Sequence, residues 1–96
     1  MNSRQRAYLR SLASKETSVF QIGKNALSPE ITEAVSECFN TRELIKISVL
    51  NNCLEDPKEL GRMLSERTGS ELISVIGKKI VLYKENKDKK KIVLPD

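Results

Sequence analysis

Residues 19–50 read VFQIGKNALSPEITEAVSECFNTRELIKISVL, and this stretch decides the fold. A short β-prone run from Ser18 to Ile22 is followed by a glycine loop and by a strong helix start at Ser28-Pro29-Glu30. Residues 44–50 form a second run with β-branched residues in alternation. The helix between the two runs has apolar residues at helical spacing, namely Ile31, Ala34, Val35, Cys38 and Phe39. This order of strand, helix and strand predicts an α/β fold.

The second predicted strand has two unlike sides. Ile45, Ile47 and Val49 share one side, whereas Lys46 and Ser48 share the other. We therefore expect one face of the sheet to be buried and the other to be partly open, with Lys46 projecting from the open face.

Helix signals also flank this unit. A first helix over about residues 3–13 has Gln5 placed for a capping box on Asn2. A third helix begins at residues 56–59 (DPKE), which predict a capping box with proline at the first helical position, and it ends near Thr68-Gly69. Both segments are expected to be amphipathic helices that pack on the sheet.

The C-terminal third predicts a hairpin and a tail. Two β-prone runs, residues 72–76 and 79–83, join through Gly77-Lys78. The whole order is an N-terminal helix followed by βαβαββ, a mixed four-stranded sheet whose right-handed crossovers place the second and third helices on one face. We expect one domain over residues 1–84, followed at 85–96 by a basic linker and a C-terminal arm that either folds back or stays loose.

The charge of the chain favours polyanionic partners or acidic surfaces. Its 96 residues include 17 lysines and arginines against 13 aspartates and glutamates, a formal net charge of +4. No stretch approaches the ~20 apolar residues that a membrane-spanning helix needs, and the N-terminus lacks the apolar segment of a signal peptide. We therefore expect a cytoplasmic protein that binds no membrane.

Catalytic side chains are scarce in this sequence. It has no histidine, and Cys38 and Cys53 lack a metal-ligand spacing and indicate free thiols in a reducing compartment. The carboxylates near the starts of the second and third helices suit capping and the helix dipole. No nucleotide loop, nucleophile elbow or tuned acid pair is recognisable. We therefore expect no enzyme, no metal, no cofactor and no small-molecule substrate.

The loop Gly23-Lys24-Asn25-Ala26 connects the first strand to the second helix. Glycine permits close approach of a ligand, the unpaired amides of a helix N-terminus favour an anion, and Lys24 adds a full positive charge. These features predict a phosphate-binding loop. A plain turn that only bends the chain would use the same residues.

Further basic residues flank the predicted sheet. Lys78 and Lys79 lie at the hairpin turn, where lysine also serves as an ordinary turn residue that protects a sheet edge. The arginines of the first helix either decorate a solvated surface or enlarge a basic patch; they are Arg4, Arg6 and Arg10. Loops at the ends of the sheet can bring five cations to one side, namely Lys24, Arg42, Lys46, Lys78 and Lys79.

Five blocks of sequence carry a resemblance to a known family. They are residues 6–13 (RAYLRSLA), 20–25 (FQIGKN), 42–46 (RELIK), 56–59 (DPKE) and 75–83 (VIGKKIVLY). In this order they resemble the CRM domain (chloroplast RNA splicing and ribosome maturation) family, and specifically its stand-alone bacterial YhbY-like members. The resemblance implies a fold similar to the C-terminal domain of translation initiation factor three. It also implies RNA binding, associated in bacteria with precursors of the large ribosomal subunit and in plants with group II intron splicing.

The RNA-contacting element of that family is a GxxG loop, compared with the loop by which KH domains clamp a nucleic-acid backbone. Gly23, Lys24 and Asn25 match this loop, whereas Ala26 replaces the second glycine. A left-handed φ at position 26 would cost alanine about 1 kcal/mol or more. The family pattern also retains Arg42 and Lys46. With the hairpin lysines, the implied RNA-binding residues are Gly23, Lys24, Asn25, Ala26, Arg42, Lys46, Lys78 and Lys79.

Our hypothesis is a noncatalytic, monomeric RNA-binding protein that holds large-subunit ribosomal RNA, or its precursor particle, during ribosome assembly. Two tyrosines and two phenylalanines are the only aromatic residues, so recognition is expected through the RNA backbone rather than by base stacking. A protein-docking module on an assembly factor or ribosomal protein, which would use the partly open face of the sheet, is the alternative. An RNA-modifying or nucleolytic enzyme is disfavoured because the catalytic groups are missing.

Overall fold

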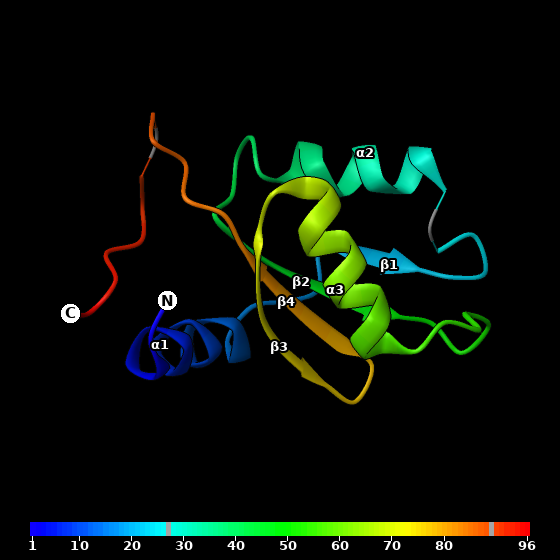
Figure 1. Ribbon diagram of the computed structural model, residues 1–96, viewed down its shortest axis with the longest axis horizontal. Coiled ribbons are helices and arrows are strands. Elements are labelled where there is room, and N and C mark those ends of the chain that lie inside the picture. The colour runs from blue at the N-terminus through cyan, green and yellow to red at the C-terminus, as the bar shows by residue number, and fades with distance from the viewer. Residues whose placement is uncertain (27, 89) are drawn as a thin grey trace.

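The computed structural model describes residues 1–26, 28–88 and 90–96, so Leu27 after the predicted loop and Lys89 of the predicted linker lie outside the description. Its elements in chain order are α1 (Ser3–Ser14), β1 (Phe20–Ile22), α2 (Pro29–Cys38), β2 (Leu44–Val49), α3 (Pro57–Thr68), β3 (Glu71–Ile76) and β4 (Lys79–Tyr83). The strands lie in the order β1-β2-β4-β3, with β1 parallel to β2 and β4 antiparallel to both of its neighbours. The predicted βαβαββ order and mixed four-stranded sheet are confirmed (Figure 1).

The helix ends follow from short-range side-chain hydrogen bonds. At α1 the Asn2 side chain accepts the Gln5 amide at 2.8 Å and the Gln5 side chain accepts the Asn2 amide at 3.1 Å, which confirms the capping box. At α3 the Asp56 carboxylate accepts the Lys58 amide at 3.1 Å. The capping box predicted there is wrong, because the Glu59 carboxylate accepts the Arg62 guanidinium instead of turning back to the chain.

Different helices cover the two faces of the sheet. Helices α2 and α3 lie together on one face, as the crossover rule predicted, and close over an apolar cluster that includes Val35, Ile47 and Leu64. Helix α1 lies on the other face, where Leu9 and Ala13 pack on residues of β3 and β4. The face that was expected to be partly open is therefore covered over one half by α1, and its open half lies beyond the last turn of that helix (Figure 1).

The C-terminal arm folds back, which decides between the two alternatives left by the sequence. Ile92 and Leu94 pack against the cluster beneath α1, and the Gln5 side chain donates to the Pro95 carbonyl at 3.0 Å. The two ends of the chain consequently lie at the same corner of the molecule (Figure 1).

Candidate nucleic-acid interface

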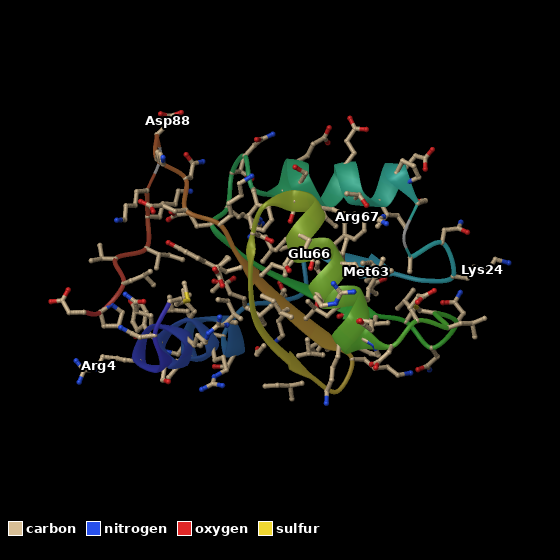
Figure 2. The ribbon with its side chains drawn as sticks, viewed as in Figure 1. Arg4, Lys24, Met63, Glu66, Arg67 and Asp88 are labelled. Atoms are coloured by element: carbon tan, nitrogen blue, oxygen red, sulfur yellow. The ribbon has the colours of Figure 1, made fainter. Side chains whose placement is uncertain are left out.

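The loop formed by Gly23, Lys24, Asn25 and Ala26 lies at the end of the sheet where β1 finishes and α2 is about to begin. The loop shares this end of the molecule with the connection between β2 and α3, and Lys24 points away from the body (Figure 2). The loop turns on itself through a hydrogen bond from the Ser28 amide to the Asn25 carbonyl at 3.1 Å. A ligand can therefore approach the loop without displacing any packed element.

The loop itself offers the free backbone donors. The amides of Lys24, Asn25 and Ala26 donate to no other residue in the described part of the chain. The first turn of α2 offers less than the sequence predicted, because Pro29 has no N–H and the Ile31 amide donates to the Ser28 hydroxyl at 3.3 Å. The candidate donors to an anion are thus the amides of the loop rather than those of the helix terminus.

The replacement of the second loop glycine by Ala26 carries no backbone penalty. No described residue other than glycine has a positive φ, so alanine at position 26 is in an ordinary conformation. Its side chain is 4% exposed and packs in the cluster under α2 and α3. The methyl group therefore points into the core and not toward a ligand, and the cost of about 1 kcal/mol considered above does not arise.

Gly23 lies close to the side chain of Asn52. A Cβ atom at Gly23 would lie 2.9 Å from the side-chain oxygen of Asn52, which belongs to the connection between β2 and α3. A side chain at position 23 would therefore displace the exposed side chain of Asn52. The Leu50 amide also donates to the Ile22 carbonyl at 2.8 Å, which joins the two loops side by side.

Three of the five predicted cations gather at this end of the sheet. The ends of β1 and β2 coincide because the strands are parallel, and the hairpin turn between β3 and β4 meets the end of β2. The Val49 amide donates to the Lys78 carbonyl at 2.8 Å, and the Lys78 ammonium donates to the Asn51 side chain. Lys24, Lys78 and Lys79 are therefore brought to the same end.

The two remaining cations lie elsewhere. Arg42 precedes the first residue of β2, so it lies at the opposite end of the sheet, in a groove that Tyr8 and Lys91 also line. The expected gathering of Arg42 with Lys24 is therefore wrong. Lys46 lies in the middle of β2 on the α1 face, where its ammonium is 3.4 Å from the Ala13 carbonyl oxygen and 3.5 Å from that of Glu16. Lys46 thus neutralises the negative end of the α1 dipole.

The sequence analysis missed the role of Glu43, which is 3% exposed. Its carboxylate accepts the amides of Asn86, Lys91 and Ile92 at 2.9, 2.6 and 2.8 Å and so fixes the C-terminal arm. Burial alone would raise the pKa of this carboxyl, but the three amides and the charge of Lys90 hold the pKa below its ordinary value. No local pattern signals this role, because the partners lie 43 to 49 residues away.

Two further kinds of feature are absent from the described residues. They contain no group of three or more carboxylate or cysteine side chains that could hold a metal ion. Nor do they contain a helix with the length and apolar character that crossing a membrane requires.

Comparison with known proteins decides the family. The CRS1 / YhbY (CRM) domain pattern matches residues 1–84. This chain belongs to that family. The CRM domain is 41% identical over 95 residues to the "Probable RNA-binding protein YqeI" of Bacillus subtilis, and the match covers 99% of each chain. It is 26% identical over 95 residues to an RNA-binding protein of Haemophilus influenzae, covering 99% of this chain and 95% of that protein.

A solved structure shows the same fold. The CRM domain matches the solution structure of a Staphylococcus aureus protein, described there as a proposed RNA-binding protein, with a TM-score of 0.83 and 45% sequence identity. The match covers 99% of both chains. The resemblance to the CRM family that the five sequence blocks carried is therefore confirmed.

Proposed function

We propose that this CRM domain is a noncatalytic RNA-binding protein that binds large-subunit ribosomal RNA, or its precursor particle, during ribosome assembly. It acts in the cytoplasm as a monomer, with residues 1–84 as the RNA-binding domain and 85–96 as the docked arm. The observation that carries the proposal is the Gly23–Ala26 loop at the end of the sheet, where Lys24 and Asn25 are exposed and the amides of residues 24–26 donate to no other described residue. The names of the relatives support RNA as the partner.

The mode of contact follows from what the surface offers. Phe39 and Tyr83 are buried, so few aromatic rings are available to stack on bases. The loop amides and the lysines of the sheet end instead suit phosphate oxygens, which carry charge but no sequence information. We assign the contact surface to Gly23, Lys24, Asn25, Ala26, Lys78 and Lys79. Arg42 is left out because it lies at the opposite end of the sheet.

The test is binding of the full chain to protein-free large-subunit ribosomal RNA across a salt series. If about four phosphates are neutralised, the logarithmic salt slope is near −3 and affinity falls roughly fiftyfold between 50 and 200 mM salt. Lys24→Glu removes one contact and adds repulsion, so we expect affinity to fall about tenfold or more at 100 mM salt.

The matched control is Lys87→Glu, the same charge reversal on an exposed residue of the linker. This control should bind RNA nearly as well as the wild type. Equal effects of the two reversals would show that the Gly23–Ala26 loop is only a turn. Weak binding by the wild type at every salt concentration would favour the protein-docking alternative, for which the 96% exposed Leu54 beside the loop offers an apolar contact.

A further inference from the structure

A small pocket lies where the last turn of α1 meets the open half of the sheet. It has a volume of about 160 Å³, and most of its lining surface is apolar. The residues that line it are Arg10, Ala13 and Ser14 of α1, Lys46 of β2, Ser74 and Ile76 of β3, and Lys79 and Val81 of β4. Three of these side chains are cationic and no carboxylate lines the pocket. The space is sufficient for one phosphate group. We call it the α1–sheet pocket.

The lysines of the pocket are held by neutral oxygen atoms rather than by carboxylates. Lys79 donates to the Ser48 hydroxyl at 2.6 Å, and Lys46 is held by two main-chain carbonyls at 3.4 and 3.5 Å. Within the described residues, none of Arg10, Lys46 and Lys79 forms an ion pair with a carboxylate. Like charges that converge without a counterion favour binding of an anion.

Ser74 supplies a second, independent observation. Its hydroxyl is buried and has no hydrogen-bond partner among the described residues. A buried hydroxyl left unpaired costs about 1–3 kcal/mol, so such groups usually have a partner. Ser74 lines the pocket, and a phosphate oxygen bound there would supply the partner that its hydroxyl lacks.

The pocket is continuous with the sheet end that carries the Gly23–Ala26 loop. Across the four strands, one row on the α1 face consists of Gln21, Ser48, Lys79 and Ile76, which are paired in register. Lys79 therefore belongs both to the pocket and to the hairpin end where Lys78 lies. Adjacent strands are about 4.8 Å apart, so two strand spacings separate Gln21 from Lys79. Gln21 and Lys79 are exposed on either side of the buried Ser48, so an RNA backbone that leaves the loop can reach the pocket by contacting these two residues.

We propose that the α1–sheet pocket binds a phosphodiester group of the same RNA, with Arg10, Lys46 and Lys79 as its cations and Ser74 as its neutral donor. This inference rests on the proposed function for the identity of the ligand. Arg10 can bind a phosphate through two parallel N–H donors, which a lysine cannot do. The RNA is thereby held at two places, the loop and the pocket.

The pocket is tested without RNA by amide NMR titration of the full chain with dimethyl phosphate, a phosphodiester, and separately with inorganic phosphate. Dimethyl phosphate should shift the amide signals of Ser74, Lys79 and Val81 in the wild type and in Lys24→Glu, and the shifts should be lost in Arg10→Gln. Absence of shifts in the wild type would overturn the proposal that the α1–sheet pocket binds a phosphodiester. Shifts with inorganic phosphate alone would overturn the assignment to a phosphodiester.

RNA affinity then tests the identity of the ligand. Arg10→Gln should lower affinity for large-subunit ribosomal RNA about fivefold at 100 mM salt and reduce the salt slope by about 0.7, because one phosphate contact is lost. Arg4→Gln is the matched control on the same helix, since Arg4 points away from the body near the chain ends and should leave affinity unchanged (Figure 2).

The outcomes separate the two proposals. Equal affinities of Arg10→Gln and Arg4→Gln, with Lys24→Glu still impaired, would overturn the pocket as an RNA site and leave the proposed function standing. Loss of RNA binding in Arg10→Gln but not in Lys24→Glu would support the pocket and contradict the assigned role of the loop. Shifts with dimethyl phosphate but no RNA binding by the wild type would overturn the proposed function and the RNA assignment together.

Discussion

Two sets of cations on opposite faces of the sheet have different partners. On the outer surface of α3, Arg62 lies between Glu59 and Glu66, with nitrogen–oxygen distances of 3.1 and 2.8 Å. On the α1 face, the partners of Lys46 and Lys79 among the described residues are neutral oxygen atoms. The hydrogen bond and charge of Glu59, followed by those of Glu66, raise the pKa of the Arg62 guanidinium.

This difference shows which cations are available to a partner. A guanidinium that already has two carboxylates gains little from a phosphate, whereas an ammonium held by carbonyl or hydroxyl groups exchanges weak acceptors for a strong one. Net charge alone does not make this distinction, because both kinds of cation contribute equally to the formal charge of +4. Arg10, Lys46 and Lys79 have no carboxylate partner among the described residues and are therefore the better candidates for RNA contact.

The largest expected effect concerns the apolar core between the sheet and helices α2 and α3. Leu64 is completely buried between α3 and the sheet, so Leu64→Ala should lower the free energy of unfolding by about 3 kcal/mol through lost burial and a residual cavity. The measurement is urea unfolding followed by circular dichroism. Met63→Ala, at the neighbouring half-buried position of the same helix, is the control and should cost clearly less. Equal losses would contradict the closed packing.

The next largest effect concerns the C-terminal arm, which packs on the α1 face of the sheet. Glu43→Gln keeps the size of the side chain but removes the charge that three amides share, so we expect a loss of about 2 kcal/mol. Hydrogen exchange should accelerate at the amides of Lys91 and Ile92 while strand amides of β4 remain protected. Unchanged exchange at both arm amides would show that apolar packing alone holds the arm.

Acid should release the same arm without a mutation. Because the folded-state pKa of Glu43 lies below its ordinary value of 4.5, the carboxylate stabilises the docked arm at every pH above that value. The stabilisation is lost as the pH falls through the lowered pKa. Arm-amide exchange, corrected for its intrinsic pH dependence, should therefore rise below pH 4.5 in the wild type and show no such step in Glu43→Gln. A step that persists in the variant would assign the release to another group.

A smaller effect separates packing from RNA contact at the loop. Ala26→Gly should lower the free energy of unfolding by about 1 kcal/mol, because a buried methyl group is lost and the unfolded chain gains freedom. RNA affinity under conditions where the variant is folded should equal that of the wild type. A clear gain in affinity would show that the alanine obstructs the loop.

The smallest effect lies on the outer surface of α3. Arg62→Gln removes a guanidinium from exposed ion pairs, so we expect no resolvable shift in the urea midpoint and no change in RNA affinity. Arg10→Gln, which replaces an unpaired arginine on the α1 face, is the comparison and should weaken only RNA binding. Weakened RNA binding by Arg62→Gln would erase the proposed difference between the two faces.

Local signals allowed much of this fold to be predicted from sequence. The capping pair of Asn2 and Gln5 spans three residues, and the hairpin runs at 72–76 and 79–83 are separated by a single turn. Such short-range patterns depend little on the rest of the chain, so the predicted elements and the observed ones agree to within one or two residues. The pairing of α2 and α3 on one face followed from crossover handedness.

The parts that could not be predicted depend on distant segments. Nothing near Glu43 reveals that three amides beyond residue 85 will surround it, because burial of a carboxylate is decided by the completed fold. The position of Arg42 could have been deduced. If β1 and β2 are parallel, a residue that follows β1 and a residue that precedes β2 lie at opposite ends of the sheet.

The docked arm also has a practical consequence for attaching the protein to a surface or to another domain. Its final residues reach α1, where the side chain of Arg4 is 3.5 Å from the Asp96 carbonyl oxygen and that of Gln5 donates to Pro95. The chain ends therefore leave the molecule at one corner, and the Gly23–Ala26 loop lies at the far side (Figure 1). A tether fused to either end would present that loop outward, toward whatever is supplied in solution.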